Sequence, residues 1–288
     1  MTFNLEGLGR MMRITRESVA ALHDHRPRRI SFAYTHTDQP KRRVDTDHVG
    51  SFSVPFRETI GAIFEQETGL QLFESRQYGN FWRWIRTEEE FASIQRWIER
   101  QGTRVFLRDC LDLSVALDLN FPEPGAPHTE LGALEMESKH HQNPSAITCL
   151  SNALAETICD LPFYKDCRFI AAVPAPPEKE FHLPNELTKR IAAAISLVEL
   201  SGCFTFTGTK GAIKDLPFEE KWAAWEESGL AFRMPAEVGY DGSPVILIDD
   251  KYQSGTTIQF VAARMREAGI GRIYGLCVVK TLRDTDNL

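Results

Sequence analysis

Short apolar runs alternate with helical patterns of apolar residues along the second half of the chain. Apolar runs of strand length occur at residues 169–173, 245–248 and 273–279. Between the last two runs, apolar residues recur with a 3.6-residue period: Ile258, Val261, Ala262, Met265 and Ala268. Gly269 follows where a helix often ends. This order predicts a βαβ unit with two parallel strands and a right-handed crossover.

Further helical patterns precede and separate these strands. They cover residues 131–161, with a break near Asn143–Pro144, and then residues 185–200 and 217–229. Regular alternation of strands and helices is typical of a sheet with helices on both faces. We therefore predict an α/β fold for residues 128–288, a doubly wound domain with a mainly parallel sheet.

The first part of the chain has a different pattern. Its predicted elements are helices over residues 13–25 and 88–102, two strands of one sheet over 28–36 and 49–56, and a strand over 103–108. Residues 121–127 contain three prolines and a glycine, which neither a helix nor a central strand accommodates. We predict a smaller N-terminal α/β (α+β) domain over residues 1–120 and a proline-rich linker over 121–127.

Charge and composition narrow the function classes. Residues 1–120 contain 17 basic and 17 acidic residues, so the net charge of −7 falls on residues 121–288 and argues against broad nucleic-acid binding. The six cysteines form no C-x-x-C pair, which argues against a structural zinc site and fits reduced thiols of a cytoplasmic protein. No run of 18 apolar residues occurs, so we expect no membrane span.

The segment "VILIDDKYQSGTTI", residues 245–258, ends a predicted buried strand in two adjacent carboxylates. Ligands of parallel α/β sheets bind beyond the carboxyl ends of the strands. The following turn precedes a helix N-terminus, where N–H groups and the helix dipole favour an anion, and Gly255 lets the backbone approach closely. Asp249 and Asp250 can accept hydrogen bonds from sugar hydroxyls or bind magnesium. The segment therefore predicts a site for a phosphorylated sugar such as ribose 5-phosphate, and the chain has no P-loop or dinucleotide-binding glycine motif.

This segment resembles the phosphoribosyl-pyrophosphate (PRPP) binding motif of type I phosphoribosyltransferases, a hydrophobic strand followed by two acids and a Thr/Ser-Gly-x-Thr turn. The resemblance implies that Asp249 and Asp250 act in catalysis by holding the ribose 2- and 3-hydroxyls. It implies a Mg²⁺ ion near them, held mainly through PRPP and water. It also implies a cradle for the 5-phosphate, formed by Gln253, Ser254, Gly255, Thr256 and Thr257.

A weaker similarity to the ComF-like, competence-associated branch extends over residues 128–281. It rests on a helix lysine at Lys139, a V-P-x-P strand end at residues 173–176 and a helix asparagine at Asn185. The loop after that strand would bind pyrophosphate through Pro174, Ala175 and Lys179. In this chain Lys179 lies between two glutamates, so magnesium would have to bridge them to the pyrophosphate.

Residues 210–232 resemble the mobile lid of the same family. In that role Lys210, Lys214 and Lys221 would bring positive charge over the pyrophosphate in the transition state, and Lys210 and Lys214 are the expected catalytic lysines. A solvated surface is the alternative interpretation of all three.

These features lead to three hypotheses about function. The first is a PRPP-dependent phosphoribosyltransferase of nucleotide metabolism, which transfers ribose 5-phosphate to an unidentified acceptor and releases pyrophosphate. The second is a non-catalytic PRPP or nucleotide sensor, favoured by the acidic pyrophosphate loop. The third is a ComF-like accessory protein in DNA handling. The acceptor and the oligomeric state are left open, with a homodimer as one option.

The segment "YGNFWRWIR", residues 78–86, mixes aromatic residues with arginine. Trp82 and Trp84 alternate with Arg83, which is typical of a strand with one buried face. We interpret the tryptophans as core residues, with stacking on single-stranded nucleic acid as the alternative.

Overall fold

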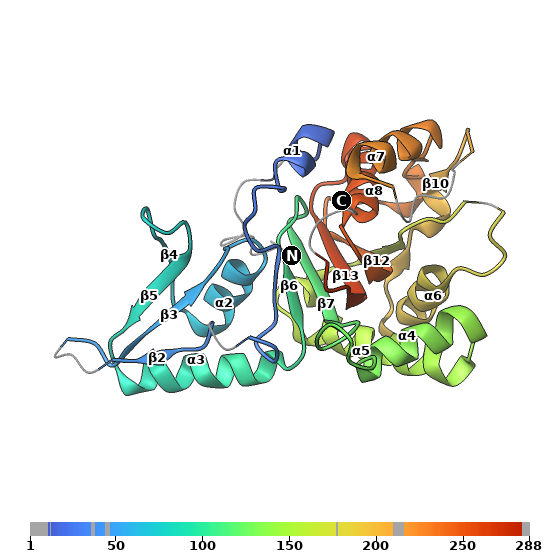
Figure 1. Cartoon of the computed structure of the whole chain (residues 1–288). Coiled ribbons are helices and arrows are strands. Elements are labelled where there is room, and N and C mark those ends of the chain that lie inside the picture. Colours follow the sequence, from blue (N-terminus) through green and yellow to red (C-terminus); the bar gives the residue numbers. More distant parts are fainter. Residues whose placement is uncertain are drawn as a thin grey trace.

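The computed structural model describes residues 11, 13–35, 38–43, 47–176, 178–209 and 216–283. Its main element is a seven-stranded sheet, in which five neighbouring strands run parallel and the two at one edge pair antiparallel (Figure 1). In spatial order the strands are β1 (Arg29–Ile30), β6 (Val105–Leu107), β7 (Leu113–Leu119), β13 (Ile273–Lys280), β12 (Val245–Tyr252), β8 (Phe169–Ala172) and β9 (Val198–Glu199).

Helices cover both faces of this sheet. One face packs against α4 (Glu130–His141), α5 (Pro144–Asp160) and α6 (Leu183–Ile195). The opposite face packs against α1 (Arg16–Ala20), α7 (Phe218–Glu227) and α8 (Thr256–Glu267). The smaller elements are a ribbon of β10 (Phe204–Thr205) and β11 (Ala231–Phe232) and the short 3₁₀ helices η1 (Tyr164–Asp166), η2 (Ser201–Cys203) and η3 (Ala236–Val238). The predicted α/β class, with a mainly parallel sheet between helices, is confirmed.

A second, antiparallel sheet lies in the chain between β1 and β6, and we call residues 38–104 the inserted module. Its strands in spatial order are β2 (Lys41–Arg42), β3 (Gly50–Val54), β5 (Phe81–Ile85) and β4 (Phe73–Glu74). Its helices are α2 (Ile60–Thr68) and α3 (Glu88–Gln101). Figure 1 shows the module at the left, away from α6 and α7.

The predicted division into residues 1–120, a linker and residues 128–288 is wrong for the main sheet. Strand β7 pairs in parallel with β13, and β6 and β1 extend the same sheet. Residues 121–127 form the loop between β7 and α4. The strands predicted at 28–36 and 49–56 also belong to different sheets, because β1 pairs with β6 and β3 pairs with β2 and β5.

Several local predictions are confirmed with their capping groups. The Thr87 side chain accepts a hydrogen bond from the N–H of Glu90 at 3.2 Å at the start of α3, and Gly102 ends that helix. Asn143 caps α5, with Pro144 in its first turn. The predicted helix over 185–200 ends at Ile195, and residues 198–199 form β9 instead.

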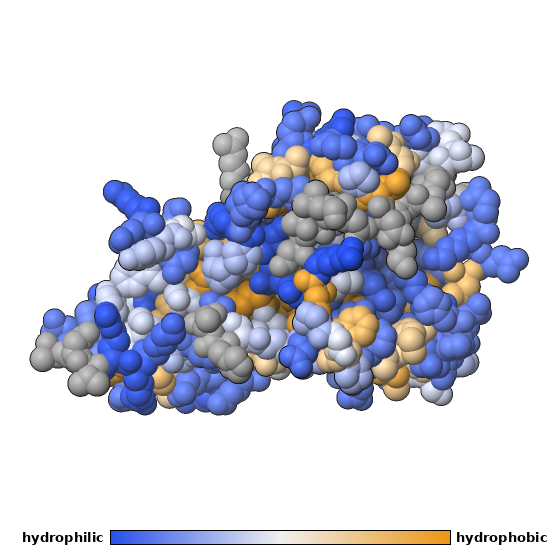
Figure 2. Space-filling model, in the orientation of Figure 1, coloured by the Kyte–Doolittle hydropathy of each residue, from blue (hydrophilic) through white to orange (hydrophobic). Residues whose placement is uncertain are grey.

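The exposed surface contains mainly hydrophilic side chains in the view of Figure 2, with apolar ones visible between the inserted module and the main sheet. All six cysteines are unpaired, and Cys149 and Cys159 are exposed. Among the residues that the structure describes, none of the helices is both long and apolar enough to cross a membrane.

Candidate functional site

Asp249 and Asp250 lie near the end of β12, the central strand of the parallel part of the sheet. The N–H of Val173 donates to the carbonyl of Ile248 at 2.8 Å, so the loop that follows β8 starts beside the two aspartates. Parallel strands end at one edge of their sheet, where ligands of α/β proteins bind. We call this the carboxyl edge.

Asp250 takes part in a chain of ion pairs at this edge. Lys139 of α4 places its Nζ 2.6 Å from Oδ2 of Asp250 and 3.6 Å from Oε1 of Glu135. The other carboxylate oxygen of Glu135 lies 2.7 Å from Nζ of Lys251. With Asp249, the group contains three carboxylates and two ammonium groups. The group therefore has one more carboxyl group than it has ammonium groups to balance the negative charge.

The two aspartates differ in their protonation. Burial raises the pKa of Asp249 to about 8, and the negative charge of Asp250 adds to this shift. Burial acts in the same direction on Asp250, but the Lys139 ammonium outweighs it, and the pKa of Asp250 is lowered. At neutral pH Asp249 therefore mainly carries a proton, whereas Asp250 is ionised. A ligand or cation that stabilises a negative charge would favour loss of the Asp249 proton.

The turn after β12 leads into α8 through a conformation that requires glycine. Gly255 is the N-cap of α8 and has a φ of +81°, in the left-handed region. A Cβ atom at this position would overlap the ring and hydroxyl of Tyr252. Arg28 supports the turn by donating to the carbonyl of Ser254 at 3.0 Å. The Oγ of Ser254 lies 3.0 Å from Oγ1 of Thr256.

A cavity of about 120 Å³ lies at this turn. Its wall contains Asp249, Lys251 and residues 252–258, together with Lys221 from α7. The volume corresponds to about four water molecules, the scale of a small anion rather than of a nucleotide. The cavity combines ammonium groups, hydroxyls and a helix N-terminus, which are the groups that bind phosphate in proteins.

Most of the predicted sugar-phosphate residues come together here. Asp249 and all five predicted phosphate-binding residues line one cavity: Gln253, Ser254, Gly255, Thr256 and Thr257. The Thr257 hydroxyl also accepts a hydrogen bond from Nε1 of Trp225 at 3.2 Å. Asp250 lies next to the cavity and is engaged by Lys139.

The predicted pyrophosphate and lid residues have more varied positions. Pro174 is buried, Ala175 is partly exposed, and Lys179 is exposed on the loop after β8. Lys210 and Lys214 lie outside the described residues. Lys221, from the same predicted lid, is buried in the wall of the cavity, so its interpretation as a solvated surface residue is wrong.

Sequence reasoning missed several groups around the site. Glu135 joins two lysines there, and its i,i+4 spacing from Lys139 on a predicted helix was a usable signal. Burial lowers the pKa of His182, at the start of α6, to about 4, and the positive charge of Lys179 adds to the shift. Asp109 accepts a hydrogen bond from the Tyr252 hydroxyl at 3.1 Å, and no local pattern marks this contact between distant residues.

The metal-binding capacity of the site is limited. Over the described ranges, no group of three or more His, Cys, Asp and Glu side chains could hold a metal ion. Asp249 and Asp250 supply carboxylate oxygens, which magnesium prefers, but Asp250 is already paired with Lys139. The two residues fit a magnesium ion that takes most of its ligands from a phosphorylated compound and water.

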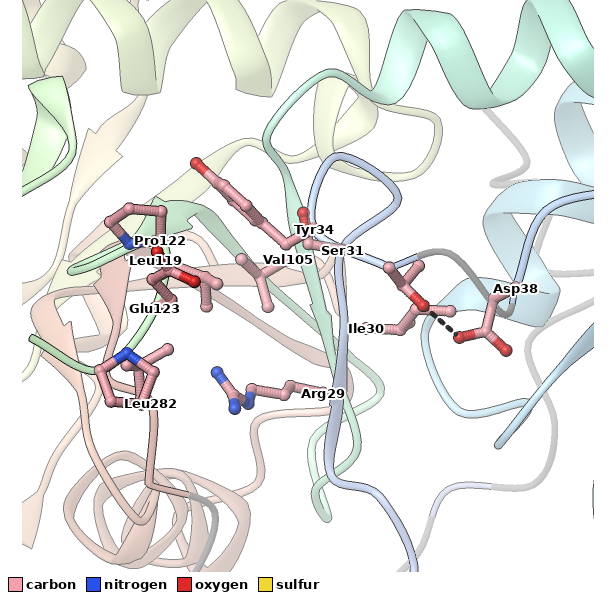
Figure 3. A pocket seen from close by; sticks show the side chains of 12 residues that line it. Arg29, Ile30, Ser31, Tyr34, Asp38, Val105, Leu119, Pro122, Glu123 and Leu282 are labelled. Carbon is pink, nitrogen blue, oxygen red and sulfur yellow. Dashed lines mark hydrogen bonds between the residues drawn. The ribbon is translucent and has the colours of Figure 1, made fainter. Parts of the chain in front are cut away.

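A second cavity, of about 290 Å³, lies at the same edge beyond β1, β7 and β13 (Figure 3). Val105, Leu119 and Leu282 contribute apolar surface, and Figure 3 shows the guanidinium of Arg29 turned toward Leu282. Tyr34 also lines it and donates its hydroxyl to Asp118 at 2.8 Å. This cavity therefore offers an aromatic ring, apolar surface and charged groups.

The raised pKa of Asp249 predicts a specific pH dependence of stability in metal-free buffer. An unfolded aspartate titrates near its usual 3.8, whereas the folded pKa is about 8. Between these values the folded state holds a proton that the unfolded chain has released, so this residue makes the free energy of unfolding fall as pH rises. One group contributes at most about 1.4 kcal/mol per pH unit. Asp249→Asn is expected to remove this contribution.

The measurement is urea unfolding of wild type and Asp249→Asn at several pH values between 5 and 8. The difference between the two proteins cancels the titration of other groups, and it should grow in favour of the variant as pH rises. A difference that stays constant over this range would contradict the assignment.

The arrangement presents the kinds of group that bind phosphates and sugar hydroxyls in proteins. It supplies a phosphate-sized cavity, two carboxylates at its rim and a second, larger cavity on the same edge of the sheet. Comparison of the sequence with models of known protein families gave no match, and comparison with curated proteins found no relative.

Proposed function

We propose that the protein is a phosphoribosyltransferase with a type I fold of the ComF-like branch, which binds PRPP with Mg²⁺ at the carboxyl edge. The supporting observation is the cavity where Asp249 and residues 253–257 meet Lys221. Carboxylates cannot bind a phosphate directly, so the two kinds of group have separate roles. Asp249 and Asp250 bind the ribose hydroxyls, and the turn with the α8 N-terminus binds the 5-phosphate.

In the proposed reaction, the acceptor attacks C1 of the ribose. The bond between C1 and the pyrophosphate oxygen breaks, pyrophosphate leaves with the bonding electrons, and the acceptor loses a proton. The chain contributes position and charge rather than a general base. In this proposal Pro174, Ala175 and Lys179 bind the pyrophosphate, and Lys210 and Lys214 are the lysines that supply positive charge to it. Magnesium, when bound with PRPP, would neutralise part of the pyrophosphate charge.

The second cavity is the proposed acceptor site. Arg28 contacts the phosphate turn, and its neighbour in the sequence, Arg29, lines this second cavity. The Tyr34 ring and the neighbouring apolar surface suit a planar acceptor, and the charged groups suit its polar edge. We expect a planar, ring-containing acceptor of roughly nucleobase size.

The test is calorimetric titration of PRPP into the purified protein with and without Mg²⁺, followed by a screen for pyrophosphate release with ring-containing acceptors. We expect magnesium-dependent binding of PRPP and pyrophosphate release with at least one acceptor. No binding of PRPP, ribose 5-phosphate or any nucleotide would contradict the proposal.

A non-catalytic sensor of ribose phosphates is the second candidate. The loop after β8 favours it, because Glu178 and Glu180 flank the exposed Lys179 and would repel pyrophosphate. In the same titration a sensor would bind ribose 5-phosphate or a nucleotide as tightly as PRPP. It would release no pyrophosphate with any acceptor.

A further inference from the structure

The inserted module carries aromatic side chains on one face of its four-stranded sheet. Trp84 lies opposite Ser51, and Trp82 lies opposite Ser53 on one side and Phe73 on the other. Residues directly opposite each other in antiparallel strands project from the same face. We call this the aromatic face, which contains Lys41, Arg43, Ser51, Ser53, Phe73, Trp82 and Trp84.

The opposite face of the sheet forms the core of the module. Phe52, Val54 and Ile85 are buried there in one apolar cluster with residues of α2 and α3. Arg83, between the two tryptophans, is also buried on that side and pairs with Glu90 of α3 at 3.1 Å. The interpretation of Trp82 and Trp84 as core residues is therefore wrong, because the arginine takes the inward position.

Two aromatic side chains of the module are exposed, and two of its tryptophans are partly exposed. Phe73 is 55% exposed, and Tyr78 in the β4–β5 turn is 74% exposed. Trp82 and Trp84 are partly exposed and contact each other edge to face, with ring centroids 5.2 Å apart. The other three tryptophans are at most 2% exposed, namely Trp97, Trp222 and Trp225.

Positive charge lies on the same face. Lys41 is opposite Ser51, and the Arg43 guanidinium lies 4.6 Å from the centroid of the Trp84 ring. His48 stacks on Trp84 with ring centroids 4.7 Å apart. Arg42, between the two cations, points to the other face and pairs with Glu88 at 2.8 Å. Within the described part of the chain, none of the strand residues on the aromatic face is acidic.

We propose that the aromatic face binds single-stranded nucleic acid. Bases of any sequence stack on aromatic side chains, and nearby Lys and Arg bind the phosphates, as in known four-stranded RNA-binding sheets. The strand residues described on this face offer rings, hydroxyls and cations but no aliphatic side chain, which favours bases and phosphates over an apolar protein surface. This site is separate from the carboxyl edge and does not depend on phosphoribosyl transfer.

The test uses fluorescently labelled oligonucleotides of about 15 nucleotides, oligo(dT) and oligo(U), and measures anisotropy with the full chain at low salt. Trp82→Ala/Trp84→Ala is expected to weaken binding roughly 10- to 100-fold, whereas Trp82→Phe/Trp84→Phe retains most of it. Binding should also quench part of the intrinsic fluorescence of wild type, because bases that stack on the partly exposed Trp82 and Trp84 quench the emission of these two residues. Circular dichroism checks that each variant is folded.

The charge contribution has a matched control within the module. Lys41→Ala/Arg43→Ala removes two cations from the aromatic face and should lower the slope of log affinity against log salt by about 1.4. Arg96→Ala/Arg100→Ala removes two exposed cations from α3 and should leave affinity and slope unchanged. Equal effects of both charge pairs, or no binding of either oligonucleotide at low salt, would overturn the proposal. A different outcome is that wild type binds no oligonucleotide but dimerises as its concentration rises, and that Trp82→Ala/Trp84→Ala does not dimerise. This outcome would overturn the proposal and identify the aromatic face as a self-association surface.

Discussion

Replacement of both Asp249 and Asp250 by asparagine is expected to lower the affinity for Mg-PRPP by about 30- to 150-fold. Each side chain is proposed to accept at least one hydrogen bond from a ribose hydroxyl. The asparagine oxygen can still accept this bond, but without the negative charge its contribution falls from about 1.5–3 to about 0.5–1.5 kcal/mol. The two positions together therefore lose about 2–3 kcal/mol of binding free energy. Folding should survive, because asparagine preserves the side-chain shape and Lys139 retains Glu135 at 3.6 Å.

The measurement is calorimetry with three ligands, since they separate the roles of the two ends of the site. PRPP and ribose 5-phosphate share the ribose hydroxyls and should both lose affinity, whereas any binding of free pyrophosphate should change little. Asp160→Asn is the control, because this exposed acid at the end of α5 pairs with Arg104 away from the cavity. Affinity within threefold of wild type in the double variant would exclude the proposed sugar contacts.

Gly255→Ala is expected to destabilise the protein by about 2–5 kcal/mol and to abolish binding at the phosphate cavity. The backbone φ of +81° costs a residue with a Cβ about 1–2 kcal/mol. Overlap of the new Cβ with Tyr252 adds about 1–3 kcal/mol, because the buried ring can move only at the expense of its neighbours. Urea unfolding measures the first effect and ribose 5-phosphate titration the second.

Gly269→Ala, after the other end of α8, is the matched control. Its φ of +89° imposes the same backbone strain, but a Cβ there would meet nothing within 4 Å. It should therefore cost only about 1–2 kcal/mol and leave ligand binding intact. A Tyr252→Leu background should reduce the cost of Gly255→Ala. If both glycine substitutions lower the free energy of unfolding by the same amount, the overlap with Tyr252 adds no strain, and the larger effect expected for Gly255→Ala is contradicted.

Local patterns were sufficient for the part of the fold that forms the site. The apolar run at 245–248, the turn and the periodic helix after it predict β12, α8 and β13 in the observed parallel arrangement. All the information lies within about 35 consecutive residues, so no distant contact had to be inferred. The turn chemistry also identified the residues that line the cavity.

The domain division failed because of strand β7. It is buried along its whole length, so it lacks the alternation that marks a half-exposed strand, and the proline-rich loop directly after it resembled a linker. Its parallel partner β13 begins more than 150 residues later, at Ile273. Sequence periodicity contains no information on which distant strands pair.

The electrostatics of the site and the orientation of β5 could not be predicted for the same reason. Asp250 and Lys139 are 111 positions apart, and only the packing of α4 against the sheet brings them together. For β5 the predicted alternation of buried and exposed positions was correct, but the prediction placed the tryptophans rather than Arg83 on the buried face. Burial of Arg83 depends on Glu90 and on the carbonyl of Gln71, which accepts a hydrogen bond from Arg83 at 3.2 Å.

The position of β13 also affects the order in which the molecule is completed during synthesis. β13 is the last strand of the described chain, yet it lies between β7 and β12 and is a parallel partner of both. Because a ribosome makes the chain from its N-terminus, β7 and β12 must wait for Ile273–Lys280 before they join one sheet. The strands of the inserted module lie within residues 41–85 and can pair much earlier. A nascent chain can therefore present the aromatic face before the carboxyl edge exists.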